Sequence, residues 1–273
     1  MRRIAQISDL HFGSHDLRAA DDLLASLAAH NPDLVVLSGD FTQRARRAEF
    51  AEACIFLNAI PQPKLVVPGN HDLPLYDLIN RMRRPLKNFQ RYVAPLGLAG
   101  DFFEDEEIAI LGLSTARRFP GKSGRVSFEQ IDKIHSVFGK VPARAFKALV
   151  THHPLGYPVG ETPSGVAGRS GHVLKALDAL DVHLLFSGHG HRPLSGEVKF
   201  ETAENRSILV LHAGTAISTR TREGHGNTYN LVDIDGPEVA IRIMEWSGAE
   251  GFRERQETGY RVEDGGWRRI SRQ

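Results

Sequence analysis

The stretch VHLLFSGHGH, residues 182–191, contains the pattern that decides the fold. Its apolar run, residues 182–186, is typical of a buried strand, and the Ser-Gly pair that follows ends the strand. Two histidines, His189 and His191, then stand on either side of one glycine. Imidazoles in this position can face solvent, pack in the core or bind a ligand, so the other strand ends of the chain must decide between these interpretations.

Short apolar segments recur through the first two thirds of the chain, and most of them alternate with segments at helical spacing. The expected strands are residues 3–8, 34–37, 64–67, 102–104, 108–113 and 146–151, and the expected helices are residues 17–28, 49–60, 75–92 and 173–180, with a further helix opened by Ser127 and its capping-box partner Gln130. This alternation predicts parallel strands buried between helices. After residue 191, strand-like runs separated by turns predict an antiparallel segment.

These elements predict an α/β fold, a four-layer αββα sandwich of two mixed sheets with a ligand site at the carboxyl ends of the strands. Helices cover the outer faces of the two sheets. We assign residues 1–250 to one domain and residues 251–273 to a C-terminal tail that packs as a strand on the same domain. The sequence contains neither a clear linker nor a repeat of solenoid period.

Composition excludes several classes of protein. The 273 residues are 41% apolar and 25% charged, as in ordinary globular proteins, and the formal net charge of +1 argues against long nucleic acid as a partner. Because no apolar run is long enough to span a bilayer and the first residues lack a signal-peptide segment, we expect a cytoplasmic protein without a membrane partner. The single cysteine, Cys54, excludes an internal disulfide and a multi-thiolate zinc site.

Oxygen and imidazole donors follow five of the expected strands. They are Asp9, His11, Asp40, Asn70, His152, His189 and His191. Seven donors exceed the needs of one tetrahedral ion, but they can serve two ions with four protein contacts each if one carboxylate bridges. Mixed donors of this kind favour divalent or trivalent Mn, Fe, Zn, Co or Ni over Ca, and paired ions about 3.5–4 Å apart are suited to in-line displacement at phosphorus.

The motifs DLH, GD, GNHD, HH and GHGH occur in this order between residues 9 and 191. Together they resemble the motifs of the calcineurin-like metallophosphoesterases. The resemblance implies a first metal held by Asp9, His11, Asp40 and His191, and a second held by Asp40, Asn70, His152 and His189. It also implies that His71, in GNHD, contacts the scissile phosphate and protonates the leaving group, with Asn70 and Asp40 as further catalytic residues.

One segment narrows the resemblance to a branch of this family. GRVSFEQI, residues 124–131, is followed by THHP and is similar to the G-x-L-S-x-x-Q pattern of the class III cyclic-nucleotide phosphodiesterases. The stretch LGLSTARR, residues 111–118, departs from those enzymes, which commonly have an Asp near the position of Ser114. This departure leaves the identity of the substrate open, but it does not change the phosphoester hydrolysis that the resemblance implies.

The expected function is therefore that of a dinuclear-metal-dependent phosphodiesterase. It would hydrolyse small phosphodiesters, with 3′,5′-cyclic nucleotides as the first candidates, through attack by a hydroxide held by both ions. The alternatives are a broad phosphomonoesterase, a nuclease acting on nucleic-acid ends, and a catalytically silent metal-binding interaction module. The last is disfavoured because all seven donors and His71 are present. The resemblance is also compatible with a homodimer.

Several residues near the expected site have two interpretations. Arg44, Arg117 and Arg118 can bind the substrate or form surface ion pairs. The Gly- and Pro-rich residues 156–171 form a loop that either sets specificity or only connects two elements. A lipid-headgroup hydrolase would need an amphipathic or basic docking helix, for which residues 75–92 are the candidate segment.

His153 and His212 each adjoin or end a strand near the same edge as the expected donors. A hydrogen bond to a metal-binding residue and simple packing are equally compatible with these positions.

Overall fold

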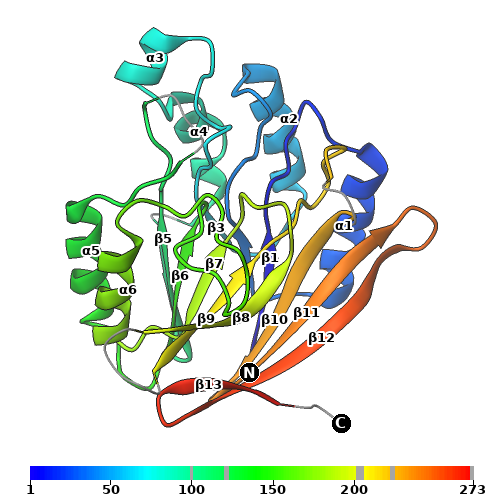
Figure 1. The fold of residues 1–273 in the computed structure, drawn as a ribbon. Coiled ribbons are helices and arrows are strands. Elements are labelled where there is room, and N and C mark those ends of the chain that lie inside the picture. The colour runs from blue at the N-terminus through cyan, green and yellow to red at the C-terminus, as the bar shows by residue number, and fades with distance from the viewer. Residues whose placement is uncertain (99–100, 120–122, 201–205, 222–224, 271–273) are drawn as a thin grey trace.

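The computed structural model describes residues 1–98, 101–119, 123–200, 206–221 and 225–270. Two sheets lie face to face, with helices on the outer face of each (Figure 1). The predicted α/β fold with two mixed sheets is confirmed. In the described ranges, no helix has both the length and the apolar character needed to cross a membrane.

The larger sheet has seven strands and includes the first and the last strand of the described chain. Its order is β13 (Gly266–Ile270), β12 (Gly251–Glu263), β11 (Glu238–Ser247), β10 (Thr228–Asp235), β1 (Arg2–Ile7), β2 (Leu34–Leu37) and β3 (Lys64–Val66). Strands β1, β2 and β3 are parallel, and the remaining pairs are antiparallel. The tail therefore continues this sheet as β12 and β13, while the division at residue 250 stays a prediction.

The smaller sheet has six strands with a parallel centre. Its order is β4 (Phe102–Glu104), β5 (Ile108–Leu113), β6 (Phe146–Thr151), β7 (Leu184–Ser187), β9 (Ser207–His212) and β8 (Leu194–Lys199). Only the edge strands β4 and β8 are antiparallel to their neighbours. The parallel strands of both sheets direct their carboxyl ends toward the same edge of the molecule (Figure 1).

The helices divide between the two outer faces. They are α1 (Leu17–His30), α2 (Arg47–Asn58), α3 (Leu78–Arg83), α4 (Lys87–Tyr92), the 3-10 helix η1 (Ala94–Leu96), α5 (Phe128–Phe138) and α6 (Ser170–Ala179). Helices α1 and α2 cover the larger sheet, and α5 and α6 cover the smaller one (Figure 1). The capping box of Ser127 and Gln130 at the start of α5 is confirmed.

The single helix expected over residues 75–92 is wrong. The structure divides this segment into α3 and α4, which are separated by Pro85. Proline has no backbone N–H and disfavours the helical conformation of the residue before it. Arg84 accordingly has a φ of −144° and ends α3.

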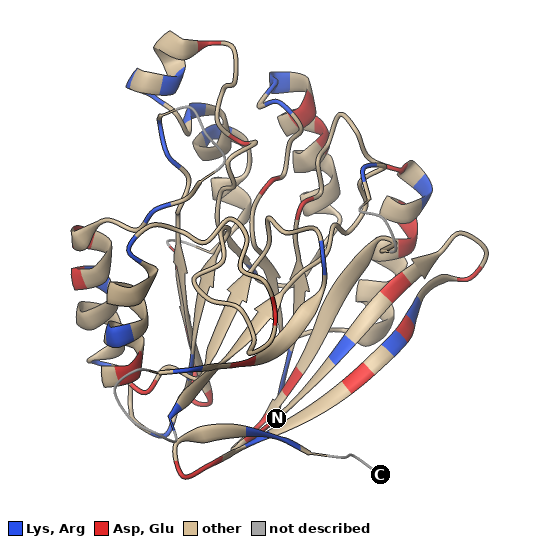
Figure 2. Ribbon diagram, in the orientation of Figure 1, with Lys and Arg blue, Asp and Glu red and all other residues tan. Residues whose placement is uncertain are grey.

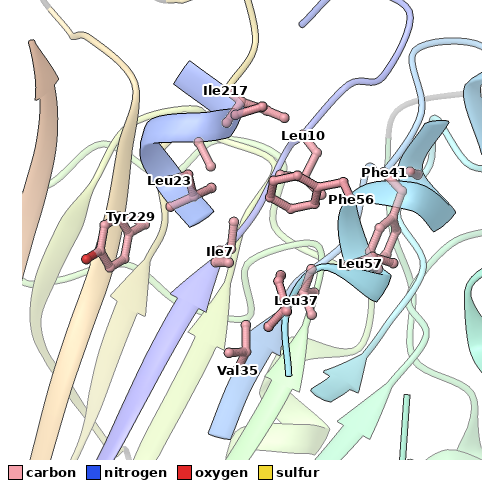
Figure 3. Packing of buried hydrophobic residues seen from close by; sticks show 14 of the residues in the cluster. Ile7, Leu10, Leu23, Val35, Leu37, Phe41, Phe56, Leu57, Ile217 and Tyr229 are labelled. Carbon is pink, nitrogen blue, oxygen red and sulfur yellow. The ribbon is translucent and has the colours of Figure 1, made fainter. Parts of the chain in front are cut away.

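Alternation along the central strands generates the apolar layers. In β2, Val35 and Leu37 belong to the cluster between the larger sheet and its helices, whereas Leu34 and Val36 belong to the cluster between the sheets. Figure 3 shows the outer cluster, in which Leu23 of α1 and Leu57 of α2 lie over these strands. A third cluster fills the space between the smaller sheet and its helices. Each central strand is thus apolar on both faces, as four layers require.

A buried polar contact joins the two sheets below the ligand edge. Gln6 of β1 donates from Nε2 to the carbonyl oxygen of Ser187 on β7, at 2.9 Å. Asn230 of β10 donates to Gln6 Oε1 at 2.9 Å and to the carbonyl oxygen of His212 at 3.2 Å. Because buried polar groups without partners are costly, these bonds favour one alignment of the sheets.

A histidine of the smaller sheet packs beside the C-terminal tail. The ring of His183 stacks on Phe146 with centroids 4.9 Å apart, and its Nδ1 accepts a hydrogen bond from the Lys147 backbone N–H at 3.1 Å. Trp267 of β13 donates to the carbonyl oxygen of His183 at 3.1 Å. Burial, and then the charge of Lys147, lower the pKa of His183 to about 4. The fold therefore favours the neutral imidazole.

We expect His183→Asn to reduce the loss of stability on acidification. A histidine whose pKa falls from 6.5 to about 4 on folding contributes its stability fully above pH 6.5 and loses it as the pH falls toward 4. Between about pH 7 and pH 5, the unfolding free energy of the wild type should fall by on the order of 2 kcal/mol more than that of the variant. Urea unfolding measures the difference, with the exposed His135→Asn as control. Equal losses in the wild type and His183→Asn would contradict this account.

Candidate metal centre

The structure brings all seven expected donors, together with His71, to one edge of the two sheets. Asp9 and Asp40 follow β1 and β2 of the larger sheet, and Asn70 follows β3. His152 follows β6 of the smaller sheet, and His189 follows β7, as does His191 two residues later. The site therefore draws its oxygen donors from one sheet and most of its imidazoles from the other.

Four of these side chains form a first cluster, in which one donor atom from each lies within 4.8 Å of the others. His191 Nε2 lies 3.1 Å from Asp9 Oδ1 and 3.2 Å from His11 Nε2. His11 Nε2 is also 3.8 Å from Asp9 Oδ1 and 4.0 Å from Asp40 Oδ2. The Nε2 atoms of both imidazoles thus point toward one region between the carboxylates of Asp9 and Asp40.

A second group begins at the other side of Asp40. His152 Nε2 lies 3.3 Å from Asp40 Oδ2 and 3.2 Å from Asn70 Oδ1. The ring centroid of His189 is 5.2 Å from that of His152. Asp40 Oδ2 therefore stands between the two groups, where a carboxylate can serve ligands on both sides.

The chemistry of the donors fits metal binding. Asp9 Oδ1 is buried and, apart from the approach of His191 Nε2 at 3.1 Å, has no hydrogen-bond partner among the described residues. Of the facing Nε2 atoms of His11 and His191, only one can carry the proton of a hydrogen bond between them. A cation among these atoms would satisfy the carboxylate oxygen and both imidazole lone pairs at once.

Burial and mutual charge set the protonation of the site. Burial favours the neutral carboxyl, but His191 holds the pKa of Asp9 below its usual range and His152 does the same for Asp40. Burial lowers the pKa of His11 and of His189 to about 4. The site accordingly presents ionised carboxylates, with neutral imidazoles at His11 and His189. Burial disfavours the charged form of His152, but the negative charges and hydrogen bonds around it, those of Asp40 above all, outweigh this effect and raise the pKa of His152 to about 9, so a cation that binds there would displace a proton.

Backbone conformation is unusual at five of the expected donors. Asp9, His11, Asp40, His189 and His191 have φ values between 51° and 67°. Non-glycine residues seldom adopt this left-handed region, although Asp and His are among those that tolerate it best. Such conformations cost about 1–3 kcal/mol each and cluster at functional sites. The strained backbone at these strand ends therefore indicates a functional site, and this indication is independent of the side chains.

Two glycines allow the loops to pack closely. Gly39 has a φ of +98°, and a Cβ on it would lie 2.6 Å from His152 Nδ1. A Cβ on Gly69 would overlap the carboxylate of Asp40. Neither position has room for a side chain, so both glycines are required for the approach of the loops that hold Asp40, Asn70 and His152.

Hydrogen bonds from neighbouring backbone groups orient the rings. His152 Nδ1 donates to the carbonyl oxygen of Ser38 at 2.8 Å, which directs Nε2 toward Asp40. His71 Nδ1 donates to the carbonyl oxygen of Gln43 at 2.8 Å, and the His71 backbone N–H donates to Asp40 Oδ1 at 2.8 Å. These contacts fix both rings before any ligand binds.

Two cavities adjoin the site. The first has a volume of about 410 Å³ and is lined by His11, Asp40, Asn70, His71, His189, His191, Arg220 and Thr221. The second, of about 610 Å³, lies beside His189 and is lined by Tyr157, Thr162 and Ser164 of the loop over residues 156–171, together with His212 and His225. The loop thus lies next to the site, as the sequence suggested.

The three arginines singled out in the sequence do not line the first cavity. Arg44 donates to Tyr76 Oη at 2.5 Å, and the backbone oxygens of Arg117 and Arg118 accept from Arg81. None of the three is among the described residues that line the first cavity, whereas Arg220 is. The sequence offered no signal for Arg220, because it follows β9 in a segment without a recognisable motif.

His153 and His212, which the sequence left open between packing and support of a metal ligand, are both buried. His153 lies beside His152 and His189, with one nitrogen from each ring within 4.8 Å of the others. Its Nδ1 is 2.8 Å from Thr115 Oγ1. His212 donates to the carbonyl oxygen of Gly156 at 3.0 Å and so anchors the loop that follows β6.

The profile of the calcineurin-like phosphoesterase family matches residues 2–193. The chain therefore belongs to this family and is a metal-dependent phosphoesterase. It is 25% identical to the 3′,5′-cyclic adenosine monophosphate phosphodiesterase CpdA of Escherichia coli K12 over 211 residues, which cover 70% of each chain. It is 38% identical to the glycerophosphodiester phosphodiesterase GpdQ of Enterobacter lignolyticus over 80 residues, 25% of this chain and 29% of that protein.

Among solved structures, the fold is similar to that of a dimetal phosphatase from Danio rerio. The TM-score is 0.65 at 13% identity, and the alignment covers 94% of this chain and 98% of the other. At this identity the likeness concerns the fold, and it agrees with the two packed sheets described above.

Asp72 holds the loop that carries Asn70 and His71. Its buried carboxyl accepts from the Gly69 N–H at 2.9 Å, from the Thr42 N–H at 3.0 Å and from Thr42 Oγ1 at 3.1 Å. Burial, and then the charge of Asp40, raise the pKa of Asp72 to about 7. The residue connects the ends of β2 and β3 without facing the cavity.

We expect Asp72→Asn to lower both stability and turnover. The amide cannot accept all three bonds and directs N–H groups at donors, which costs about 1–3 kcal/mol of unfolding free energy. The loosened loop should also lower kcat for a phosphoester substrate, although the hydrogen bonds of the Asp72 side chain go to Gly69 and Thr42 and not to the expected metal ligands. Denaturant unfolding and steady-state kinetics measure the two effects, with the exposed Asp132→Asn on α5 as control. An unchanged kcat in Asp72→Asn would show that the loop does not need this anchor.

Proposed function

We propose that the chain is a dinuclear-metal phosphodiesterase that hydrolyses small phosphodiesters, with 3′,5′-cyclic nucleotides as the first candidates. The observation that carries the proposal is the position of Asp40 Oδ2, between His11 Nε2 at 4.0 Å and His152 Nε2 at 3.3 Å. A shared carboxylate between two groups of donors is an arrangement suited to a pair of ions. Relatives named for cyclic-nucleotide and glycerophosphodiester hydrolysis support a diester as the substrate.

The two groups of donors divide between the proposed ions. The first would be held by Asp9, His11, Asp40 and His191, and the second by Asp40, Asn70, His152 and His189. Imidazole and oxygen donors in this mixture suit Mn, Fe, Zn, Co or Ni. When bound, such ions lower the pKa of water and neutralise the charge that develops on phosphorus oxygens.

The chain's own residues would position the substrate and move a proton. His71 lines the cavity, and its Nδ1 bond to Gln43 leaves Nε2 available to contact the scissile phosphate and to protonate the leaving oxygen. Arg220 supplies a fixed positive charge at the cavity wall for a phosphate oxygen. The loop over residues 156–171 borders the second cavity, where the remainder of a diester could bind.

We expect purified protein to hydrolyse bis(p-nitrophenyl) phosphate with Mn²⁺ and to lose this activity on chelation. Asp40→Ala removes the shared donor and His71→Ala the proposed acid, so each should lower kcat by about a hundredfold or more. The matched controls are Asp132→Ala and His135→Ala, both on the exposed side of α5. Cyclic AMP, glycerophosphodiesters and p-nitrophenyl phosphate, assayed in parallel, identify the substrate class. Turnover of the monoester alone would overturn the diesterase proposal.

The number of bound ions gives a second test. After equilibration with Mn²⁺ and desalting, elemental analysis should find two ions in the wild type and about one in His191→Ala, because this histidine belongs to only one group of donors. Asp40→Ala should retain less than His191→Ala, since both groups lose a ligand. His135→Ala again serves as the control. A single ion in the wild type would exclude the dinuclear site.

A further inference from the structure

Helix α3 exposes apolar side chains and buries a charged one, the reverse of the usual arrangement on a surface helix. Its side chains Leu78 and Ile79 are 58% and 69% exposed, whereas Arg81 on the same helix is only 3% exposed. A helix on the surface of a globular protein normally buries its apolar side chains and exposes its charges. Single exposed leucines are common, but an apolar face turned outward while an arginine is buried requires an explanation.

The exposed apolar side chains of this region form one group, which we call the apolar tip. It consists of Leu75, Tyr76, Leu78, Ile79, Met82 and Phe119, all of them exposed. Arg81 joins the two segments of the tip, because its guanidinium donates to the carbonyl oxygens of Arg118 at 2.7 Å and Pro74 at 3.0 Å. The buried arginine therefore braces the tip from inside.

The tip stands at the same edge of the molecule as the metal centre. In Figure 1, α3 projects beyond the carboxyl ends of the strands. Tyr76 Oη accepts from Arg44, which directly follows Gln43, and the carbonyl oxygen of Gln43 accepts from His71. The tip is thus connected to the site through consecutive residues of one loop.

The charge around the tip is positive. Residues 75–92 contain Arg81, Arg83, Arg84, Lys87 and Arg91 but only one acidic residue, Asp77. Arg83, Arg84 and Lys87 are exposed, as is Arg118 beside Phe119. Figure 2 shows the basic bands on α3. Over the whole chain the net charge is only +1, so the excess of positive charge is local.

We propose that the apolar tip docks the enzyme on the surface of an anionic lipid bilayer. Apolar and aromatic side chains would enter the boundary between headgroups and acyl chains, while the exposed arginines contact anionic headgroups. A twofold contact between two copies through this tip would instead place Arg83 and Arg84 against their equals, which like-charge repulsion disfavours. An interfacial contact of this kind needs no membrane-spanning helix. The proposal does not depend on which phosphoester the enzyme hydrolyses.

Docking would orient the metal centre toward the bilayer. Because the tip and the cavity share one edge, the cavity would face phosphate groups that lie at or near the headgroup level. The expectation of no membrane partner followed from the lack of a spanning segment, and it did not address an interfacial contact of this kind.

Vesicle flotation tests the proposal. At low salt, the wild type should float with vesicles of phosphatidylcholine and phosphatidylglycerol and much less with phosphatidylcholine alone, and added salt should weaken binding. The double variant Leu78→Gln/Ile79→Gln should bind the anionic vesicles at least about tenfold more weakly than the wild type, because it removes inserted apolar surface. Leu17→Gln/Ile55→Gln is the matched control, since these two residues are equally apolar and each is 73% exposed on other helices.

Charge is tested separately. Arg83→Glu/Arg84→Glu should also weaken binding about tenfold or more, whereas Lys140→Glu/Arg144→Glu, at exposed positions between α5 and β6, should not. All four double variants should keep the wild-type thermal stability and hydrolysis of a soluble phosphoester, which shows that the loss concerns docking alone. The proposal is overturned if the wild type fails to float with the anionic vesicles, or if the tip variant floats equally well. It is also overturned if sedimentation shows that the tip variant loses a dimer instead.

Discussion

Two buried carboxylates, Asp9 and Asp40, impose the constraint on which the rest of this structure depends. Ionised carboxylates out of contact with water are costly unless charge or hydrogen bonds compensate them. The chain supplies that compensation from imidazoles on the opposite sheet, above all His191 and His152. The packing of the two sheets, the left-handed turns at the strand ends and the close approach of the glycine loops all serve to bring these groups together.

Much of this arrangement could be predicted from the sequence, because local patterns carried it. The strands at residues 34–37 and 108–113 have the predicted bounds, since β-branched and apolar runs between turn residues leave few alternatives. The donors follow strands, and the carboxyl ends of parallel strands meet at one edge. Their convergence therefore followed from topology, even though the roles of single residues such as Asn70 remain proposals.

What could not be predicted depends on tertiary contacts. Helical spacing continued past Pro85, but the missing N–H divided the segment into α3 and α4. The burial of Arg81 was hidden because its partners are backbone oxygens near residue 118, far away in the sequence. Arg220 reaches the cavity from a segment without a motif, and only the folded chain shows it there.

The division of donors between the sheets has a thermodynamic consequence. Asp9, Asp40 and Asn70 belong to the larger sheet, and His152, His189 and His191 to the smaller one. Any ion that contacts Asp9 and His191 together is therefore a cross-link between the two halves of the sandwich. Its binding free energy adds to the free energy that keeps the sheets packed, so the midpoint of thermal unfolding should rise with the concentration of free metal. In this fold, the metal-binding side chains therefore contribute both to the site and to the stability of the packing between the two sheets.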